Sequence, residues 1–177
     1  ERGIRVLGCG PAYAQAVAEF SLGLALDLAR GISHEDRAFR LGTERYVSAG
    51  NDGAVLLRGS DIGLVGFGNL GRALLPLLAP FAATIRVFDP WLPDAVLIEA
   101  GVQPAGLPEL LGRSRFVFVL ATVTAESEHL LGGPDDVDEE HGGEEAVDVV
   151  RLGSRAGDEL LDRAHEVCVR QRPVVGA

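Results

Sequence analysis

The segment DIGLVGFGNLGRALLPLLAPFAATIRVFDP, residues 61–90, constrains this chain more than any other feature. It holds a GxGxxG pattern at Gly66, Gly68 and Gly71, which follows a short apolar run and opens a helix-like run. In such a unit the first glycine permits a sharp turn, the second lets a pyrophosphate approach the backbone, and the third lets the helix pack on the strand. The pattern predicts a nucleotide-cofactor turn; a glycine-rich turn in an unrelated α/β fold is the alternative.

An acidic residue stands where such a site would end. Asp89 closes the next apolar run, 18 residues after Gly71, and an acid there accepts hydrogen bonds from ribose hydroxyls. Its charge would repel the 2′-phosphate of NADP, and Pro90 and Trp91 follow it in place of a phosphate-binding Arg. The expected cofactor is therefore NAD.

After residue 61, strand-like and helix-like segments alternate. IGLVG, TIRVFD and FVFVLA are typical of strands, whereas NLGRALLPLLAPF, PDAVLIEAG and LPELLGR are typical of helices. The alternation predicts an α/β fold of the Rossmann type, a doubly wound parallel sheet with helices on both faces, here truncated. The helix after the glycine turn should begin near Asn69 and Leu70, presenting free N–H groups to phosphates, and should kink at Pro76.

The first third of the chain shows no such alternation of strands and helices. Residues 4–7 are a strand candidate, and residues 14–32 predict a helix with hardly any polar face, which needs a large core or a partner subunit. Residues 33–58 are more polar, and Gly and Asn mark loops around SAGNDG, residues 48–53.

Composition narrows the class of protein. The 177 residues, 47% of them hydrophobic, suffice for one good core. We find neither a leader sequence nor an apolar run of the roughly 18 residues that a membrane span needs, so we expect a cytoplasmic protein. Cys9 and Cys168 lie far apart and are expected to be reduced thiols. Because the chain contains no Met, we expect it to be a piece of a longer protein.

The net charge of −10 is concentrated toward the C-terminus. Residues 1–132 carry 11 Arg and 14 acidic residues, whereas residues 133–177 carry 5 Arg and 12 acidic residues. This balance argues against a nucleic-acid partner, whose backbone needs a basic surface. Residues 132–145 predict a hydrated charge run, and a metal site formed by His141 and these carboxylates is the less favoured interpretation.

Four segments together resemble the cofactor domain of the D-isomer-specific 2-hydroxyacid dehydrogenases. They are VAEFSLGLALDLARGI, DIGLVGFGNLGRAL, VFDPWLPD and FVFVLATVTAESEHLLG, within residues 1–132. The resemblance implies an NAD-binding Rossmann domain, a substrate domain built from both chain ends, and a homodimer. It also implies hydride transfer between NAD and the CH–OH group of a D-2-hydroxy acid. Since most of the substrate domain is missing, we expect this chain alone to be inactive.

The resemblance also assigns the cofactor residues. Asp89 would bind the adenosine ribose. The loop after FVFVL departs from the family pattern, which has His and Pro where Leu120 and Thr122 stand. The remaining assignments are Gly66, Gly68, Asn69, Leu70 and Gly71 for the pyrophosphate, and Ala121, Thr122 and Ser127 along the cofactor.

The catalytic residues match less well. Arg155, in the Ser-Arg-Ala segment 154–156, is the candidate to hold the substrate carboxylate through a charge-assisted pair, and a solvated Arg at a helix end is the alternative. The Glu and His that complete the family's catalytic group have no match. The histidines of the chain, which we interpret as surface or structural residues, are His34, His129, His141 and His165.

These observations predict three parts. Residues 1–58 form an interdomain and dimerisation helix region, residues 59–132 the dinucleotide-binding core, and residues 133–177 an acidic divergent tail or a degraded end of the cofactor domain. Two other functions stay open: a non-catalytic NAD(H)-binding sensor or corepressor-like module, and a different Rossmann enzyme such as a methyltransferase.

Overall fold

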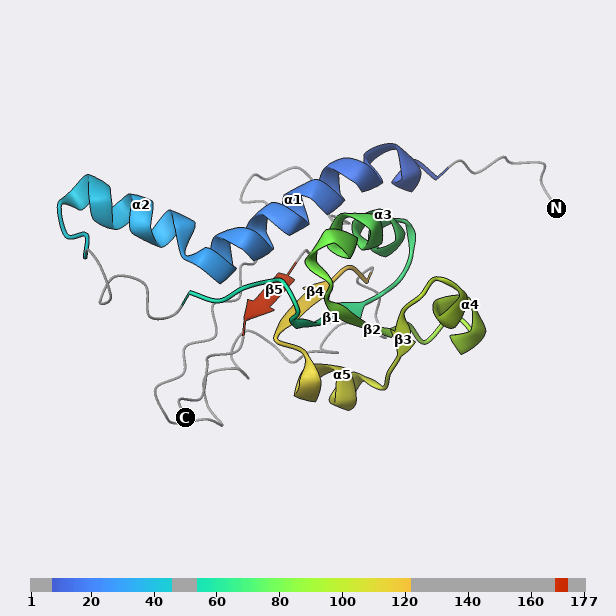
Figure 1. The fold of residues 1–177 in the computed structure, drawn as a ribbon. Coiled ribbons are helices and arrows are strands. Elements are labelled where there is room, and N and C mark those ends of the chain that lie inside the picture. The colour runs from blue at the N-terminus through green and yellow to red at the C-terminus, as the bar shows by residue number, and fades with distance from the viewer. Residues whose placement is uncertain (1–7, 46–53, 122–167, 172–177) are drawn as a thin grey trace, which may run out of the picture.

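A five-stranded sheet lies at the centre of the molecule, in the order β3-β2-β1-β4-β5 (Figure 1). The computed structural model describes residues 8–45, 54–121 and 168–171. The first four strands pair in parallel, and β5 pairs antiparallel with β4. The order of the parallel strands is that of one half of a Rossmann fold. The strands are β1 (Asp61–Val65), β2 (Thr84–Phe88), β3 (Gln103–Pro104), β4 (Phe116–Val119) and β5 (Cys168–Gln171).

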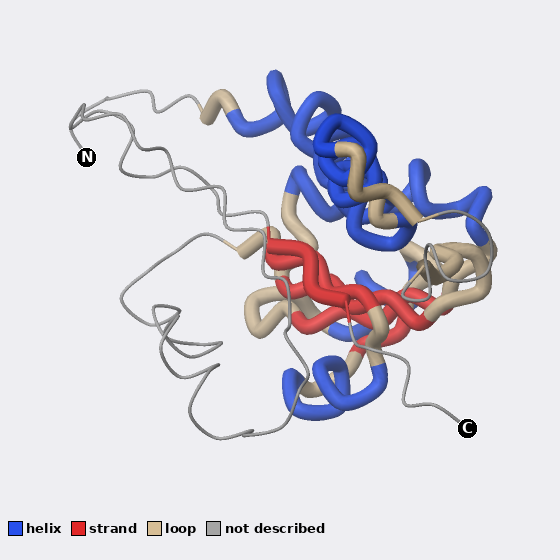
Figure 2. Tube along the Cα trace, turned by 90° about the vertical axis from the view of Figure 1, so that its left-hand side faces the viewer, coloured by secondary structure: helices blue, strands red, loops and turns tan. Residues whose placement is uncertain are grey.

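Helices cover both faces of this sheet, as Figure 2 shows from the side. α1 and α3 lie on one face, and α5 lies on the other. The predicted α/β architecture of the Rossmann type is therefore confirmed. Within the described ranges, no helix has the length and apolarity that crossing a bilayer requires. The helices are α1 (Gly10–Arg30), α2 (Ile32–Leu41), α3 (Asn69–Leu78), α4 (Asp94–Glu99) and α5 (Leu107–Arg113), and a 3₁₀ turn at Ala79–Phe81 follows α3.

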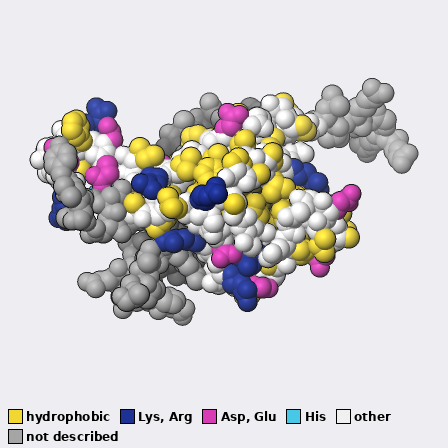
Figure 3. All heavy atoms as spheres, in the orientation of Figure 1, with side chains coloured by type: hydrophobic (Ala, Val, Ile, Leu, Met, Phe, Trp, Pro, Cys, Tyr) yellow, Lys and Arg dark blue, Asp and Glu magenta, His cyan; other side chains and the backbone are white. Residues whose placement is uncertain are grey.

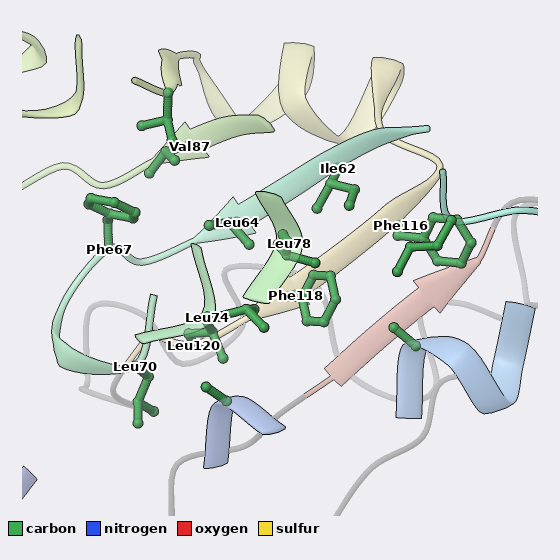
Figure 4. Packing of buried hydrophobic residues seen from close by; sticks show 14 of the residues in the cluster. Ile62, Leu64, Phe67, Leu70, Leu74, Leu78, Val87, Phe116, Phe118 and Leu120 are labelled. Atoms are coloured by element: carbon green, nitrogen blue, oxygen red, sulfur yellow. The ribbon is translucent and has the colours of Figure 1, made fainter. Parts of the chain in front are cut away.

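The core divides between the two faces because successive side chains of a strand point to opposite sides. Ile62 and Leu64 of β1 belong to the larger cluster beneath α1 and α3, together with the β4 and α3 side chains that Figure 4 labels. Val65 of β1 and Val117 of β4 pack with Leu110 of α5 on the other side. Both faces of the central strands are thus buried, as expected for parallel strands with helices on each face.

α1 packs against α3 through small side chains rather than large ones. Its buried positions recur every three or four residues, which places them along one stripe of the helix. The leucines are only partly buried, and Phe20 is 49% exposed. The predicted helix over 14–32 is confirmed, with bounds shifted to Gly10–Arg30. The buried stripe consists of Ala14, Ala18, Ser21, Ala25 and Ala29.

α2 is a helix that was not predicted from the sequence, and the loop predicted around residues 48–53 lies outside the described residues. This helix runs between Gly31 and Gly42, both of which have left-handed backbone conformations, with φ of 64° and 66°. None of its residues is buried, so it lacks the apolar content that marks a core helix. α3 begins at Asn69 as predicted and continues past Pro76 to Leu78.

One strand is added to the predicted parallel sheet in the antiparallel direction. β5 comes from the C-terminal part of the chain and pairs antiparallel with β4, with Phe116 opposite Gln171. The strand candidate at 4–7 and the acidic run at 132–145 lie outside the described residues. The boundaries at residues 58 and 132 stay predictions.

Candidate cofactor site

The site is built at the carboxyl ends of β1 and β4. β1 has β2 on one side and β4 on the other, so the chain crosses over in opposite directions from the centre of the sheet. In open α/β sheets, ligands bind in the crevice at such a switch point. Leu120 N–H donates to Val65 O at 2.8 Å, which brings the segment after β4 beside the turn after β1.

Two of the three glycines are required by close backbone contacts. Gly66 has φ of 93°, and a Cβ there would lie 2.9 Å from the Ala121 nitrogen. A Cβ at Gly71 would lie 3.0 Å from Gly66 O, so this glycine lets α3 start close to the turn. Each contact excludes a side chain at its position.

Gly68 is different, because its surroundings are open. A Cβ built there meets no atom within 4 Å, and its φ of −76° lies outside the left-handed region that favours glycine. Protein packing therefore does not explain a glycine at this position. A ligand that needs to touch the backbone does explain it, and the residues present fit the pyrophosphate of a dinucleotide.

The N-terminus of α3 points its amides at the same opening. α3 begins at Asn69 directly after Gly68, and Arg72 N–H donates to Gly68 O at 3.1 Å. The first N–H groups of a helix have no intrahelical acceptor and lie at the positive end of its dipole. The amides of Asn69, Leu70 and Gly71 are therefore disposed to bind an anion. The Arg72 guanidinium lies 5.2 Å from the centre of the Phe67 ring, which adds a positive charge near the turn.

Asp89 is fixed against the glycine turn by two backbone donors. Its Oδ2 accepts from Phe67 N–H at 2.8 Å, and its Oδ1 accepts from Trp91 N–H at 3.0 Å. A carboxylate oxygen has capacity for a further hydrogen bond. The group is thus held in place and can still accept from the two hydroxyls of a ribose.

A cavity of about 310 Å³ lies beside Asp89, between the ends of β2 and β3 and the helices α4 and α5. Its walls include apolar side chains such as Leu97 and Pro104. Asp94 and Glu109 add two more carboxylates, and the described residues that line the cavity include no Arg. This side of Asp89 is therefore acidic and unfavourable for a second phosphate.

The structure brings seven of the predicted residues together. Ala121 lies against Gly66, the other glycine-turn residues lie at the start of α3, and Asp89 lies beside Phe67. His34 is exposed on α2. The predicted residues that lie outside the described ranges are Thr122, Ser127, Arg155, His129, His141 and His165.

Sequence reasoning missed Asp94 and Glu109. Both stand in the first turn of a helix that follows a strand or its connecting loop. Loops and helix starts at the carboxyl edge of a parallel sheet line its ligand crevice. Applying that rule to every helix start, rather than to the glycine turn alone, would have found them.

The fold and this turn define a dinucleotide-binding domain of the Rossmann type. Residues 22–134 match the family model described as D-isomer specific 2-hydroxyacid dehydrogenase, NAD binding domain. The chain belongs to this family, and its cofactor is NAD. Membership removes the methyltransferase interpretation.

The chain is also similar to individual proteins whose names fit this family. The chain is 33% identical over 132 residues to D-lactate dehydrogenase of Escherichia coli and 31% identical to hydroxypyruvate reductase of Thermotoga maritima, covering 74% of this chain in both cases. It spans only 39% and 41% of those two proteins. Among solved structures, a phosphoglycerate oxidoreductase from Rhizobium etli is 53% identical with a TM-score of 0.65, over 71% of this chain and 42% of that one.

Proposed function

We propose that this chain is the cofactor-binding part of a cytoplasmic, NAD-dependent oxidoreductase. The complete protein transfers hydride between NAD and the CH–OH carbon of a D-2-hydroxy acid, with the corresponding 2-oxo acid as the other partner. The observation that carries the proposal is the Asp89 carboxylate, fixed by Phe67 N–H at 2.8 Å beside an open backbone at Gly68. NAD supplies the hydride chemistry, and these residues bind and orient it.

Charge around the ribose position supports NAD over NADP. The 2′-phosphate of NADP would meet the Asp89 carboxylate, with Asp94 and Glu109 lining the adjacent cavity. Like charges at short range disfavour binding, and no guanidinium lines that cavity to offset them. A ribose hydroxyl has no such conflict and donates to the carboxylate.

The single Trp of the chain provides the test. Trp91 is 63% exposed and lies two residues from Asp89. Bound NADH should quench its emission by energy transfer, so titration of the 177-residue chain with NADH and NADPH measures both affinities. We expect NADPH to bind at least about tenfold more weakly, a difference of about 1.4 kcal/mol.

Asp89→Ala should weaken NADH by a similar factor. The matched control is Asp36→Ala on α2, an exposed acid that pairs with Arg40 at 2.8 Å and should leave NADH affinity unchanged. Equal affinity for the two cofactors, or full NADH binding by Asp89→Ala, would contradict the proposal.

Turnover separates the enzyme from the alternative, a non-catalytic NAD(H) sensor of the same fold. Both interpretations predict NADH binding, and only the enzyme predicts hydride transfer by the complete protein. Assays follow NADH absorbance with pyruvate, glyoxylate and hydroxypyruvate. The 177-residue chain by itself should bind NADH and show no turnover, because hydride transfer needs a substrate held in near-attack geometry by a second domain. Arg155 is the residue that we propose for the substrate carboxylate.

A homodimer completes the proposal. Phe20 of α1 is 49% exposed, and Phe39 and Leu41 of α2 are 67% and 70% exposed. Figure 3 shows hydrophobic side chains gathered on the face that α1 and α3 share. Apolar surface of this kind is usually buried in a partner. Sedimentation should give a dimer, and Phe39→Asp should shift it toward monomer; a well-behaved monomer of the unaltered protein would contradict this proposal.

A further inference from the structure

A second cavity lies at the opposite edge of the sheet from the glycine turn. It has a volume of about 530 Å³ and is lined by residues 54–56 and 58–61 together with Arg115. Asp61 starts β1, whereas Gly66 follows its end, so the two regions are separated by the length of the strand, about 16 Å at roughly 3.3 Å per residue. We call this cavity the Arg115 cavity; nothing in the proposed function uses it.

Two buried nitrogens of the Arg115 guanidinium have no hydrogen-bond acceptor among the described residues. They are Nε and Nη2. The backbone holds the residue in place, because Arg115 N–H donates to Asp61 O at 2.8 Å. Burying an ionised group without a partner is costly, so an acceptor that satisfies these two atoms would stabilise the fold.

The two unsatisfied nitrogens of Arg115 are placed so that one anion can accept from both. Nε–H and one Nη–H of a guanidinium project side by side, and this fork matches two oxygens of a phosphate or carboxylate. A single anion that accepts both bonds would therefore satisfy Arg115 completely on that side.

The charges around the cavity also favour an anion. Asp61, the only acid among the described residues of the lining, pairs through Oδ1 with Arg86 Nη1 at 2.5 Å, so its charge is already offset. Arg58 contributes a second guanidinium, which is anchored by donation from Nη1 to Pro80 O at 3.3 Å. The lining thus carries two Arg without a compensating free carboxylate, in a chain whose net charge is −10.

We propose that the Arg115 cavity binds a small phosphate-bearing molecule, with Arg115 as the bidentate ligand and Arg58 as the second positive charge. Two guanidiniums suit a dianion better than a single carboxylate. The volume lies within the range of small-molecule sites and exceeds the needs of one ion, which leaves room for an organic group. The site is independent of the cofactor, because it occupies the other end of β1.

The test uses the full 177-residue chain and isothermal titration with inorganic phosphate at constant ionic strength, set with sodium chloride. A second arm uses glycerol 3-phosphate, a phosphate monoester. Both arms are run with and without saturating NADH, which occupies the glycine turn. We expect saturable binding that NADH does not displace and that Arg115→Gln weakens by about tenfold or more. The matched control is Arg113→Gln, an exposed neighbour that pairs with Glu109 at 3.5 Å and should bind as the unaltered chain does.

Each outcome is decisive. Tighter binding of the monoester assigns the cavity to a phosphorylated molecule, and equal binding assigns it to the free anion; both keep the anion site. Absence of saturable binding, unchanged binding by Arg115→Gln, or displacement by NADH would overturn the proposal. If circular dichroism shows Arg115→Gln unfolded, Arg115→Lys keeps the charge and loses the fork, and unchanged affinity in that variant would also overturn it. Failure of NADH to bind would concern the proposed function alone.

Discussion

The carboxylate of Asp89 accepts a hydrogen bond from the backbone N–H of Phe67 at 2.8 Å, joining the end of β2 to the glycine turn after β1. One residue therefore shapes the turn and presents a negative charge to the position that we propose for the ribose. These two roles can be separated by substitution.

Asp89→Asn should change cofactor preference more than folding. The amide oxygen can still accept from Phe67 N–H, so only the exposed bond from Trp91 N–H is lost, whereas the charge that repels a 2′-phosphate is gone. We expect the ratio of NADH to NADPH affinity, measured by quenching of Trp91, to fall by about tenfold or more. An unchanged ratio, with normal circular dichroism, would show that Asp89 does not select the cofactor.

Alanine at Gly66 should lower stability, whereas alanine at Gly68 should lower NADH affinity. Gly66→Ala forces a side chain into φ of 93° and against the Ala121 nitrogen, so it should lower the free energy of unfolding by about 1–3 kcal/mol. Gly68→Ala meets open space, so it should leave stability within about 0.5 kcal/mol and weaken NADH by blocking the pyrophosphate. Urea unfolding and NADH titration of both variants check this. Equal stability losses would mean that the open space at Gly68 is not reserved for a ligand.

Gly63 should be coupled to Leu110. A Cβ at Gly63 in β1 would contact the Leu110 side chain of α5 and lie 2.7 Å from Ser114 Oγ. We expect Gly63→Ala to lower the free energy of unfolding by about 1–3 kcal/mol through overpacking. Leu110→Ala removes part of the clash, so the double variant should be more stable than the sum of the single effects predicts, by about 0.5 kcal/mol or more. Strict additivity in urea unfolding would count against this contact.

Cys9 should control the ionisation of Tyr13. The Cys9 Sγ lies 4.0 Å from the Tyr13 hydroxyl, and hydrogen bonding with Cys9, followed by its charge repulsion, raises the pKa of Tyr13 above its usual value of 10.0. Cys9→Ala should therefore lower the pKa of Tyr13, so that its phenolate forms at lower pH. Tyrosinate absorbance against pH measures the change, in a Tyr46→Phe background that leaves one tyrosine. A midpoint that does not move would show that the two side chains are not in contact.

The parts of the fold that were predicted correctly depend on short stretches of sequence. The turn from β1 into α3 requires Gly66, Gly68 and Gly71 at fixed offsets, and these requirements act within one strand–turn–helix unit. α2 was missed for a related reason. Its ten residues are mostly polar and include no buried one, so the segment has few apolar positions from which to predict a helix, although Gly31 and Gly42 mark its two ends.

The sequence by itself determined the dinucleotide turn, the acid at Asp89 and the order of strands and helices between residues 61 and 119 except for the two-residue strand β3, because local spacing specifies each. Tertiary structure alone decided which segments meet. Gly66 against Ala121, β5 antiparallel to β4, and Arg115 at a cavity with Arg58 all join residues far apart in the chain. A local pattern shows that a strand exists but not which strand pairs beside it, since pairing depends on how the whole sheet packs against its helices.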